Sequence, residues 1–590
     1  MGQSLLKKAI LGLMERNSIA PAIHYDHIGY GCKEKKIFFS KGTGSFIIEN
    51  SIGERVFEGR LGEARFCEYT GENLSVGEFT EVQVPGSYRI ILKDELGKVC
   101  AESEFFEIAD GLLESQLKAN IKSFFFQRTG LELPKELAGE WARPAAHFDN
   151  AIKFHPSMNR DGLWDAHGGW YDAGDYGKYI VNGGVSVATL LLACEMNSEA
   201  AFVGGKKFKS TFEQPFCLKD EIQFELEFFL RMQDHDGGVF FKVTPEHWDG
   251  FMTPVESDSV QQRMILGKST SSTLNFAGVM AQAHRMYAGS DMQFATRCLA
   301  ASLRAYEWAC GNPAVEWPHN TEGSGGYGDE FVGDEFFWAR AMLFRSLQEI
   351  LKSENLNETI ALQLGFASAA EIQKMLNALR YELPADMEKN PPKLGLDWRD
   401  TQNLGWIALA MMEDSLDKES MTLRCKARTA LEETAEKIMN LQDEDPYSLS
   451  IRKFIWGSNG DIANHALTLL VVYGWKQDRK LVDYALEQIH FIYGRNPVNV
   501  SFVTGSAWSS PVYPHHRICH SDGVEKPIPG LLVGGINSDR QDLHRQASYP
   551  SEFPGHSYTD ERCSFASNET AINWNSPLTA VLARLSVLLG

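Results

Sequence analysis

A loop rich in glycine, aromatic and acidic residues runs directly into an apolar helical pattern at Gly168–Cys194, GGWYDAGDYGKYIVNGGVSVATLLLAC. Two carboxylates in this loop, Asp172 and Asp175, lie three residues apart and can converge on one water molecule as a general base. The alternative is a helix N-terminus, where aspartate is common as a cap and favours the helix dipole. The flanking Trp170 and Tyr171 resemble sugar-stacking platforms, although aromatic residues in loops more often serve packing.

After about residue 111 the chain has helical periodicity, in about a dozen segments separated by loops rich in Gly, Trp and Asp. No strand pattern alternates with these segments, which argues against a doubly wound sheet. Paired helices with long loops fit an α-solenoid or a closed (α/α)6 barrel, and the lack of a visible fixed-period repeat favours the barrel. The clearest segments are Tyr179–Met196, Glu221–Met232, Thr273–Met286, Asp334–Leu351, Thr359–Leu379, Met421–Met439, Leu481–Tyr493 and Glu569–Leu589.

Before residue 111 the pattern is different, with short β-rich runs separated by turns. In one run Tyr88, Ile90 and Leu92 alternate with other residues, as expected for a half-buried strand. Several such runs within about 85 residues predict a small β-sandwich. We therefore expect two domains, a β-sandwich over residues 20–110 and a helical domain over residues 111–590.

The composition of the 590-residue chain narrows the classes of partner. Its formal net charge of -21 disfavours nucleic acid and anionic membranes. The longest apolar stretches, Gly184–Cys194 and Leu467–Trp475, are too short to span a membrane. The N-terminal Met1–Arg16 shows no cleavage site for a signal peptide, so we expect a cytoplasmic protein, with the periplasm as the weaker alternative. Ten scattered cysteines indicate reduced thiols, and the oligomeric state is not indicated.

Two further signals lie near the C-terminus. Glu569 stands before an apolar helical pattern, and on its own it reads as a first-turn acid or a capping-box residue. The sequence PHHR at Pro514–Arg517 contains adjacent histidines, which point in different directions and do not form a metal pair. Hydrogen bonding of hydroxyl groups by one histidine and the arginine is the favoured interpretation.

Taken together, these motifs resemble glycoside hydrolase family nine, in the members that carry an immunoglobulin-like domain before an (α/α)6 catalytic barrel. The resemblance covers nearly the whole chain, and its specificity lies in the order of many motifs. Besides the Asp172–Asp175 loop, PHHR and the Glu569 segment, these are HYDHIGY (24–30), FFFQRTG (124–130), GEWARPAAH (139–147), MQDHDGGVFFKV (232–243), GDEFFWARA (333–341) and YGRNPVNVSFVTG (493–505).

The resemblance assigns roles residue by residue. It implies that Asp175 is the catalytic base, Asp172 its partner in holding the attacking water, and Glu569 the general acid. An inverting glycosidase needs one ionised carboxylate for the water and one protonated carboxyl for the leaving oxygen. The residues expected to bind the sugar are His515, Arg517, Trp170, Tyr327, Trp456 and Trp574.

The protein is expected to require no cofactor. The resemblance also allows predictions about two metal sites of the family, one for zinc and one for calcium. Many members of the family it resembles that have this domain order share a zinc site built from two cysteines and two histidines. Here Thr129 and Ala146 stand where the cysteines would be, so no zinc is predicted despite His147. Asp334 and Glu335 match an acidic pair that ligates a structural calcium ion in some relatives, and a solvated or salt-bridged pair is the open alternative.

The substrate is expected to be a short β-1,4-linked oligosaccharide. Within the family the chain most resembles the exo-β-D-glucosaminidase-like subgroup of chitin- and chitosan-degrading bacteria. The main interpretation is therefore an exo-β-D-glucosaminidase that releases glucosamine from chitosan oligosaccharides, and the attraction of an acidic enzyme for a cationic sugar agrees with it. The alternative is a β-1,4-glucanase, of endoglucanase or cellobiase type, acting on cello-oligosaccharides. The acidic and aromatic insertion Glu246–Asp258 either closes one end of a cleft or is a disordered surface loop. A sugar epimerase and a sugar-binding protein fit less well, since neither needs all three carboxylates.

Overall fold

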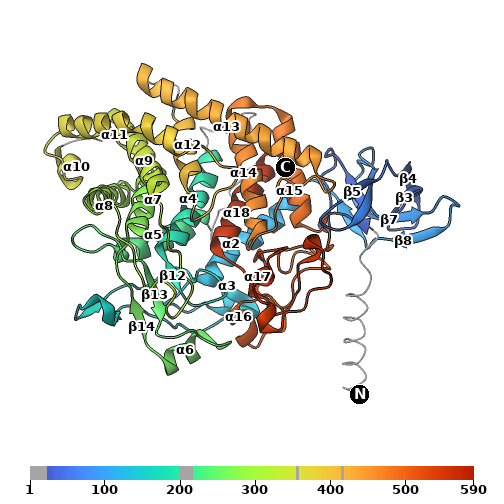
Figure 1. Cartoon of the computed structure of the whole chain (residues 1–590), viewed down its shortest axis with the longest axis horizontal. Helices are drawn as coiled ribbons and strands as arrows, with labels where there is room; N and C mark the ends of the chain where they lie inside the picture. The colour runs from blue at the N-terminus through green and yellow to red at the C-terminus, as the bar shows by residue number, and fades with distance from the viewer. Residues whose placement is uncertain (1–22, 198–216, 354–355, 357, 414–416, 590) are drawn as a thin grey trace.

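The structure is a computed structural model that describes residues 23–197, 217–353, 356, 358–413 and 417–589. Figure 1 shows a small β domain beside a large helical domain. The prediction about a signal peptide falls on Met1–Arg16 and lies outside the described residues. All ten cysteines are free thiols. None of the helices in these ranges is long and apolar enough to cross a membrane.

The β domain is a two-sheet sandwich. One sheet has the order β1-β2-β6-β5 and the other β4-β3-β7-β8, with β9 paired to β7. Phe38 from the first sheet packs with Phe46, Ile90 and Leu92 from the second, so the core lies between the sheets. The strands are β1 (Ile23–His24), β2 (Ile37–Ser40), β3 (Ser45–Asn50), β4 (Arg55–Arg60), β5 (Arg65–Cys67), β6 (Glu72–Glu78), β7 (Gly86–Lys93), β8 (Val99–Glu102) and β9 (Phe106–Ile108).

The helical domain begins at Leu112 and forms an (α/α)6 barrel, as predicted. Its inner ring consists of α4, α7, α9, α12, α14 and α18, and α18 packs against both α4 and α14. Each inner helix has an outer partner among α2, α5, α8, α11, α13 and α15. The principal helices are α2 (Leu112–Gln127), α4 (Ile180–Met196), α5 (Leu218–Met232), α7 (Thr270–Tyr287), α8 (Met292–Gly311), α9 (Gly333–Lys352), α11 (Ala369–Lys389), α12 (Gln402–Ala410), α13 (Lys418–Glu444), α14 (Ser458–Lys476), α15 (Arg479–Ile492) and α18 (Ile572–Leu589).

Shorter elements connect the ring and differ most from the sequence-based expectation. The segment predicted as one helix over Thr359–Leu379 is two helices, because Gly365 has a φ of +85°, which a continuing helix does not allow. A sheet of order β11-β10-β14-β13-β12 was not predicted, since its strands are too short to show a period. The shorter helices are α3 (Lys135–Ala138), α6 (Pro254–Val260), α10 (Glu358–Gln363), α16 (Arg517–Ser521) and α17 (Phe565–Asn568). The strands of the sheet are β10 (Ile152–Phe154), β11 (Leu163–Trp164), β12 (Lys178–Tyr179), β13 (Lys242–Pro245) and β14 (Arg263–Ile265).

The two domains meet through a buried interface that is part apolar and part polar. Tyr447 from the barrel packs with Phe39 of the sandwich. The Asp26 carboxylate lies 2.7 Å from Nδ1 of His490 on α15, and both residues are buried. Because an unpaired buried carboxylate is costly, this contact favours one fixed placement of the sandwich on the barrel.

Candidate active site

The loop that carries the two aspartates is shaped by glycines. Gly169 has a φ of +83°, and a Cβ there would collide with the Phe228 ring. At Gly174 a Cβ would collide with the carbonyl oxygen of His515. The missing side chain therefore lets the PHHR segment lie directly on the aspartate loop, although the two are far apart in sequence.

Asp172 lies at the bottom of the loop and is 2% exposed. Asn182 on α4 donates a hydrogen bond of 2.7 Å to its Oδ1, and the Tyr327 hydroxyl donates to its Oδ2. Burial, and then the neighbouring charge of Asp175, raise the pKa of Asp172 to about 7. Asp172 therefore holds a proton more readily than an ordinary aspartate.

Asp175 has a different set of partners. Its Oδ1 accepts the N–H of Gly177 at 3.0 Å, and its Oδ2 accepts the N–H of Gly325 at 3.2 Å and the hydroxyl of Tyr179 at 3.4 Å. Three donors are thus aimed at this one carboxylate and fix its orientation. The two neighbouring aspartates thus differ in their surroundings: Asp172 is buried with a raised pKa, and Asp175 is held by three donors.

Glu569 lies between α17 and α18, in a β-bridge with His515. The expectation that it begins the last helix is corrected, because that helix starts at Ile572. Burial raises the pKa of Glu569 well above its usual range, and the charge of Asp175 adds to this while Arg517 opposes it. A carboxyl that keeps its proton near neutral pH is suited to be a general acid.

The PHHR segment presents its residues on two sides. His515 lines the same cleft as the carboxylates, and its Nδ1 lies 2.6 Å from the carbonyl of Arg562, so that nitrogen carries the proton. His516 is turned into the protein, 3.2 Å from the side-chain oxygen of Gln127. The Arg517 guanidinium donates to the carbonyls of Gly174 at 2.8 Å and of Asp249 at 3.0 Å. Arg517 thus ties two loops together at the cleft wall.

The cleft that these residues share has a volume of about 940 Å³. Of the residues predicted from sequence, it is lined by Asp172, Asp175, Tyr327, Trp456, His515, Arg517, Glu569 and Trp574. Trp170 is the exception, and its predicted stacking on sugar is corrected. It is 1% exposed, its indole N–H donates to Glu221 at 2.9 Å, and its ring packs on Phe124, so it supports the loop from behind.

Sequence reasoning missed several residues of the cleft wall. Trp398 and Asp461 line it without a local motif that marks them. The insertion Glu246–Asp258 lies at the cleft, as one of its two sequence-based interpretations predicts, because its Trp248 and Phe251 line the wall just before α6. Thr253 and Glu256 form a capping box at the start of that helix, a signal that the sequence contains.

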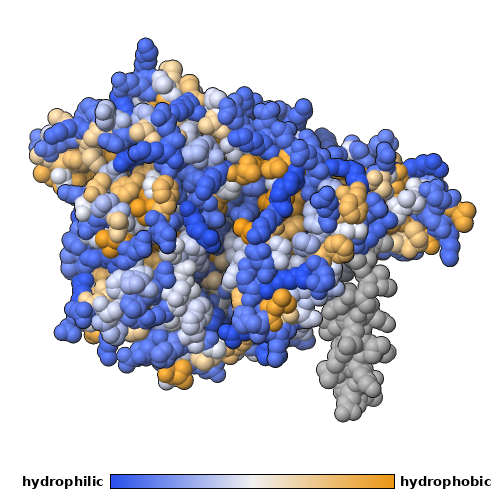
Figure 2. All heavy atoms as spheres, in the orientation of Figure 1, coloured by the Kyte–Doolittle hydropathy of each residue, from blue (hydrophilic) through white to orange (hydrophobic). Residues whose placement is uncertain are grey.

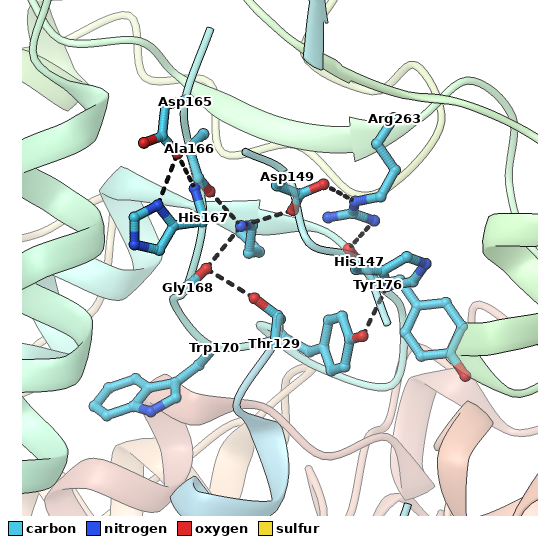
Figure 3. Close-up of polar contacts among 12 residues, drawn as sticks. Thr129, His147, Asp149, Asp165, Ala166, His167, Gly168, Trp170, Tyr176 and Arg263 are labelled. Atoms are coloured by element: carbon cyan, nitrogen blue, oxygen red, sulfur yellow. Dashed lines mark hydrogen bonds and ion pairs between the residues drawn. The ribbon is translucent and has the colours of Figure 1, made fainter. Parts of the chain in front are cut away.

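The region of the zinc site known in relatives is occupied by hydrogen bonds between protein groups (Figure 3). The Thr129 hydroxyl donates to the carbonyl of Gly168 at 2.8 Å, and Nδ1 of His147 lies 2.7 Å from the Tyr171 hydroxyl. Ala146 supplies no ligand atom, so the residues present do not fit zinc. Within the described ranges no group of three His, Cys, Asp or Glu side chains is arranged to hold a metal ion.

The acidic pair on α9 is neither solvated nor salt-bridged. Asp334 is 2% exposed and Glu335 0% exposed. Oδ2 of Asp334 accepts the N–H of Thr401 at 2.8 Å, whereas Oδ1 of Asp334, both oxygens of Glu335 and Oδ2 of Asp329 have no hydrogen-bond partner. Such a set of oxygens is of the type that calcium prefers, although the side chains as placed do not form a complete ligand group.

A carboxylate held by three hydrogen-bond donors and a carboxyl whose pKa is raised by burial face one cleft on an (α/α)6 barrel, as in the base and acid pair that inverting glycoside hydrolases use. The sequence profile of glycosyl hydrolase family 9 matches residues 114–582. The chain therefore belongs to glycosyl hydrolase family 9, and it is an inverting β-1,4-glycosidase.

Individual relatives agree with this assignment. A xyloglucan-specific endo-β-1,4-glucanase of Bacteroides ovatus is 32% identical, over 96% of this chain and 94% of its own. A cellodextrinase of Butyrivibrio fibrisolvens is 28% identical, over 95% of this chain and 98% of its own. The structure of AaCel9A in complex with cellobiose-like isofagomine superposes with a TM-score of 0.81 at 27% identity, covering 96% of this chain and 100% of that one. These relatives are described by glucan substrates, and they do not support the glucosaminidase-like subgroup.

Proposed function

We propose that the protein is a β-1,4-glucanase that cleaves soluble glucan chains, the alternative of the two substrate predictions. The observation that carries this proposal is the single cleft of about 940 Å³ that holds the three carboxylates together with aromatic side chains from separate loops. That volume is near the upper end of ordinary ligand sites and suits an oligosaccharide. The glucan-acting relatives support the choice of sugar.

In the proposed mechanism the carboxylates have separate tasks. Asp175, charged and held by three donors, takes a proton from the attacking water, and Asp172 helps to hold that water. Glu569 gives its proton to the glycosidic oxygen as the bond to the anomeric carbon breaks. Water attacks from the face opposite the leaving group, so the configuration at the anomeric carbon inverts.

One feature favours the glucosaminidase prediction as a second candidate. Asp397 and Asp461 line the same cleft, and carboxylates in a cleft attract the ammonium group of an amino sugar. Glucan hydroxyl groups also donate hydrogen bonds to carboxylates, so these residues do not exclude a glucan.

The test offers xyloglucan, cellotetraose and chitosan tetramer to the wild type and to Asp175→Ala, with products identified by mass spectrometry and the first anomer by NMR. We expect shortened glucans with α-anomeric ends from the wild type and none from the variant. Glucosamine released from chitosan alone would replace the glucanase proposal with the glucosaminidase. Wild-type turnover by Asp175→Ala would overturn the assignment of the base.

We also propose that Asp334 and Glu335 supply part of the ligands of a structural calcium ion, which further ligands would complete, since no three acidic side chains of the described residues form a metal group as placed. The support is the set of buried oxygens without hydrogen-bond partners. Calcium supplies positive charge that the neighbouring protein groups do not, and it takes no part in the proton transfers. The test is thermal unfolding with and without calcium.

A further inference from the structure

Lys242, the first residue of β13, is a fully buried lysine with an unusual set of partners. Its ammonium group donates to the carbonyl oxygens of Asn320 at 2.7 Å, Gly325 at 2.8 Å and Glu322 at 3.0 Å. Among the described residues it forms no ion pair with a carboxylate. Burying a cation is costly, so a lysine kept in such a place calls for a role.

All of these acceptors belong to the segment 320–325, which touches the aspartate loop. Gly325 gives its carbonyl to Lys242 and its N–H to Oδ2 of Asp175. The Ser324 hydroxyl, also near the ammonium group, lies 2.7 Å from the hydroxyl of Thr244 on the same strand as Lys242. The lysine therefore fixes the peptide that hydrogen-bonds the carboxylate.

Strand pairing brings Lys242 to the second donor as well. In the antiparallel pair β12 and β13, Lys242 stands opposite Tyr179. The ammonium nitrogen lies 5.5 Å from the centre of the Tyr179 ring, and the hydroxyl of this ring donates to the same oxygen of Asp175. Both donors to Oδ2 of Asp175 thus rest against one lysine.

A second buried lysine on the paired strand provides a comparison. Lys178 donates to the carbonyls of Ala166 at 2.8 Å and Gly168 at 2.7 Å, and it lies 2.7 Å from the carboxylate of Asp149. Asp149 also pairs with Arg263 at 2.8 Å, as Figure 3 shows. The charge of Lys178 is compensated by Asp149, whereas Lys242 has no ion-pair partner among the described residues and interacts electrostatically with Asp175 and Glu322.

We propose that Lys242 is a positioning residue for Asp175, which holds the Gly325 N–H and the Tyr179 hydroxyl on the base and adds positive charge beside it. This inference rests on the proposed function, in which Asp175 is the base. Burial lowers the pKa of Lys242 to about 7 and the charge of Asp175 opposes the fall, which agrees with an interaction between the two groups. Lys242 contacts no substrate and transfers no proton in this scheme.

The experiment measures kcat, KM and the pH dependence of kcat/KM on xyloglucan for Lys242→Met, Lys242→Gln and Lys242→Arg. Lys242→Met should lower kcat about 10- to 100-fold with a smaller change in KM, because the base is misplaced. The acidic limb of its kcat/KM pH profile should move to higher pH, since the Asp175 carboxylate has lost hydrogen-bond donors and a neighbouring cation. Lys242→Arg should restore part of both, and Lys242→Gln, which keeps a donor without charge, should fall between.

The matched control is Lys178→Met, which removes the other buried ammonium group. It should lower the melting temperature while its acidic limb stays at the wild-type pH, because its charge is balanced by Asp149. The other titratable groups near Lys242 are Tyr179 and Glu322, and Glu322 is itself held by His155 and His319. Replacing Glu322 by Gln shows whether this group moves the limb instead.

Two results would overturn the inference. An unchanged acidic limb in both Lys242→Met and Lys242→Gln, with losses of activity that follow the loss of folded protein seen by circular dichroism, would leave Lys242 a packing residue. If Lys242→Met does not fold, a wild-type kcat and limb in Lys242→Gln lead to the same conclusion. Failure of the proposed function is distinct, since it would appear as turnover by Asp175→Ala.

Discussion

Two groups of buried carboxylates in this barrel have different surroundings. The catalytic pair, Asp172 and Asp175, is surrounded by amide and hydroxyl donors, and its negative charge is divided between a proton and hydrogen bonds. The acidic pair on α9 is as buried, but most of its oxygens lack donors. Fixed donors suit a carboxylate that must exchange a proton, whereas bare oxygens suit one that must hold a cation.

The largest expected effect comes from removing the base. Asp175→Ala should lower kcat by about 10³-fold or more on every glycoside, because water is then not deprotonated. Azide, a nucleophile that needs no base, should restore turnover and give a glycosyl azide of inverted configuration. Steady-state kinetics with and without azide checks this, and the melting temperature shows that the variant is folded. No response to azide would count against a missing base as the cause.

Removing the acid should have an effect that depends on the leaving group. Glu569→Gln should slow hydrolysis of oligosaccharides by about 10²- to 10⁴-fold. A dinitrophenyl glycoside should be affected far less, since its phenolate leaves without a proton. The ratio of the two rates in wild type and variant is the measurement. An equal loss on both substrates would show that Glu569 is not the acid.

Calcium should stabilise the fold through the acidic pair on α9. Calcium at 100 times its dissociation constant stabilises a protein by about 2.7 kcal/mol, which should raise the melting temperature by a few degrees over protein treated with EDTA. Glu335→Gln should abolish most of this difference in melting temperature. Its kcat, corrected for the fraction of folded protein, should equal that of the wild type. Thermal unfolding by circular dichroism tests this, and equal melting temperatures with calcium and EDTA in the wild type would refute the site.

The smallest effect concerns the pH dependence of stability. Asp172 has a pKa of about 7 when folded and about 3.9 when unfolded, so between these values the folded state binds the extra proton. Its contribution to stability is therefore present at low pH and is lost as the pH rises toward 7. Asp172→Asn should flatten the decline of the melting temperature between pH 4 and pH 7 relative to the wild type. A parallel decline in both would show that Asp172 is ionised throughout.

The sequence could predict the fold because its signals are local, whereas the roles of the three carboxylates came from the resemblance carried by the ordered motifs. Strand alternation, long helical periodicity and the ordered motifs are all readable within short windows, and the sandwich and barrel are confirmed. The orientation of a single side chain was harder to predict where long-range contacts decide it. Trp170 has the same chemistry as Trp456, but its ring turns inward against Phe124, which no neighbour in sequence reveals.

The composition predicts the polarity of the surface but not the shape of the cleft. Figure 2 shows mainly hydrophilic residues on one face, with apolar residues in small scattered patches, as the acidic composition suggests. The cleft aromatics Trp248 and Trp398 come from loops whose positions are set by helices far away in the chain. Composition reports the charge of such a surface, whereas the shape of the cleft depends on how the ring closes.

That closure has a consequence for the order in which the protein is made. Helix α18 packs against α4 and α14, and the N–H of its first residue, Ile572, donates to the carbonyl of Asp172 at 2.9 Å. The apolar surface of α4 that packs against α18 therefore stays uncovered by that helix until nearly four hundred further residues have been synthesised. A growing chain has no working site until this helix has left the ribosome, so activity itself reports that the ring has closed.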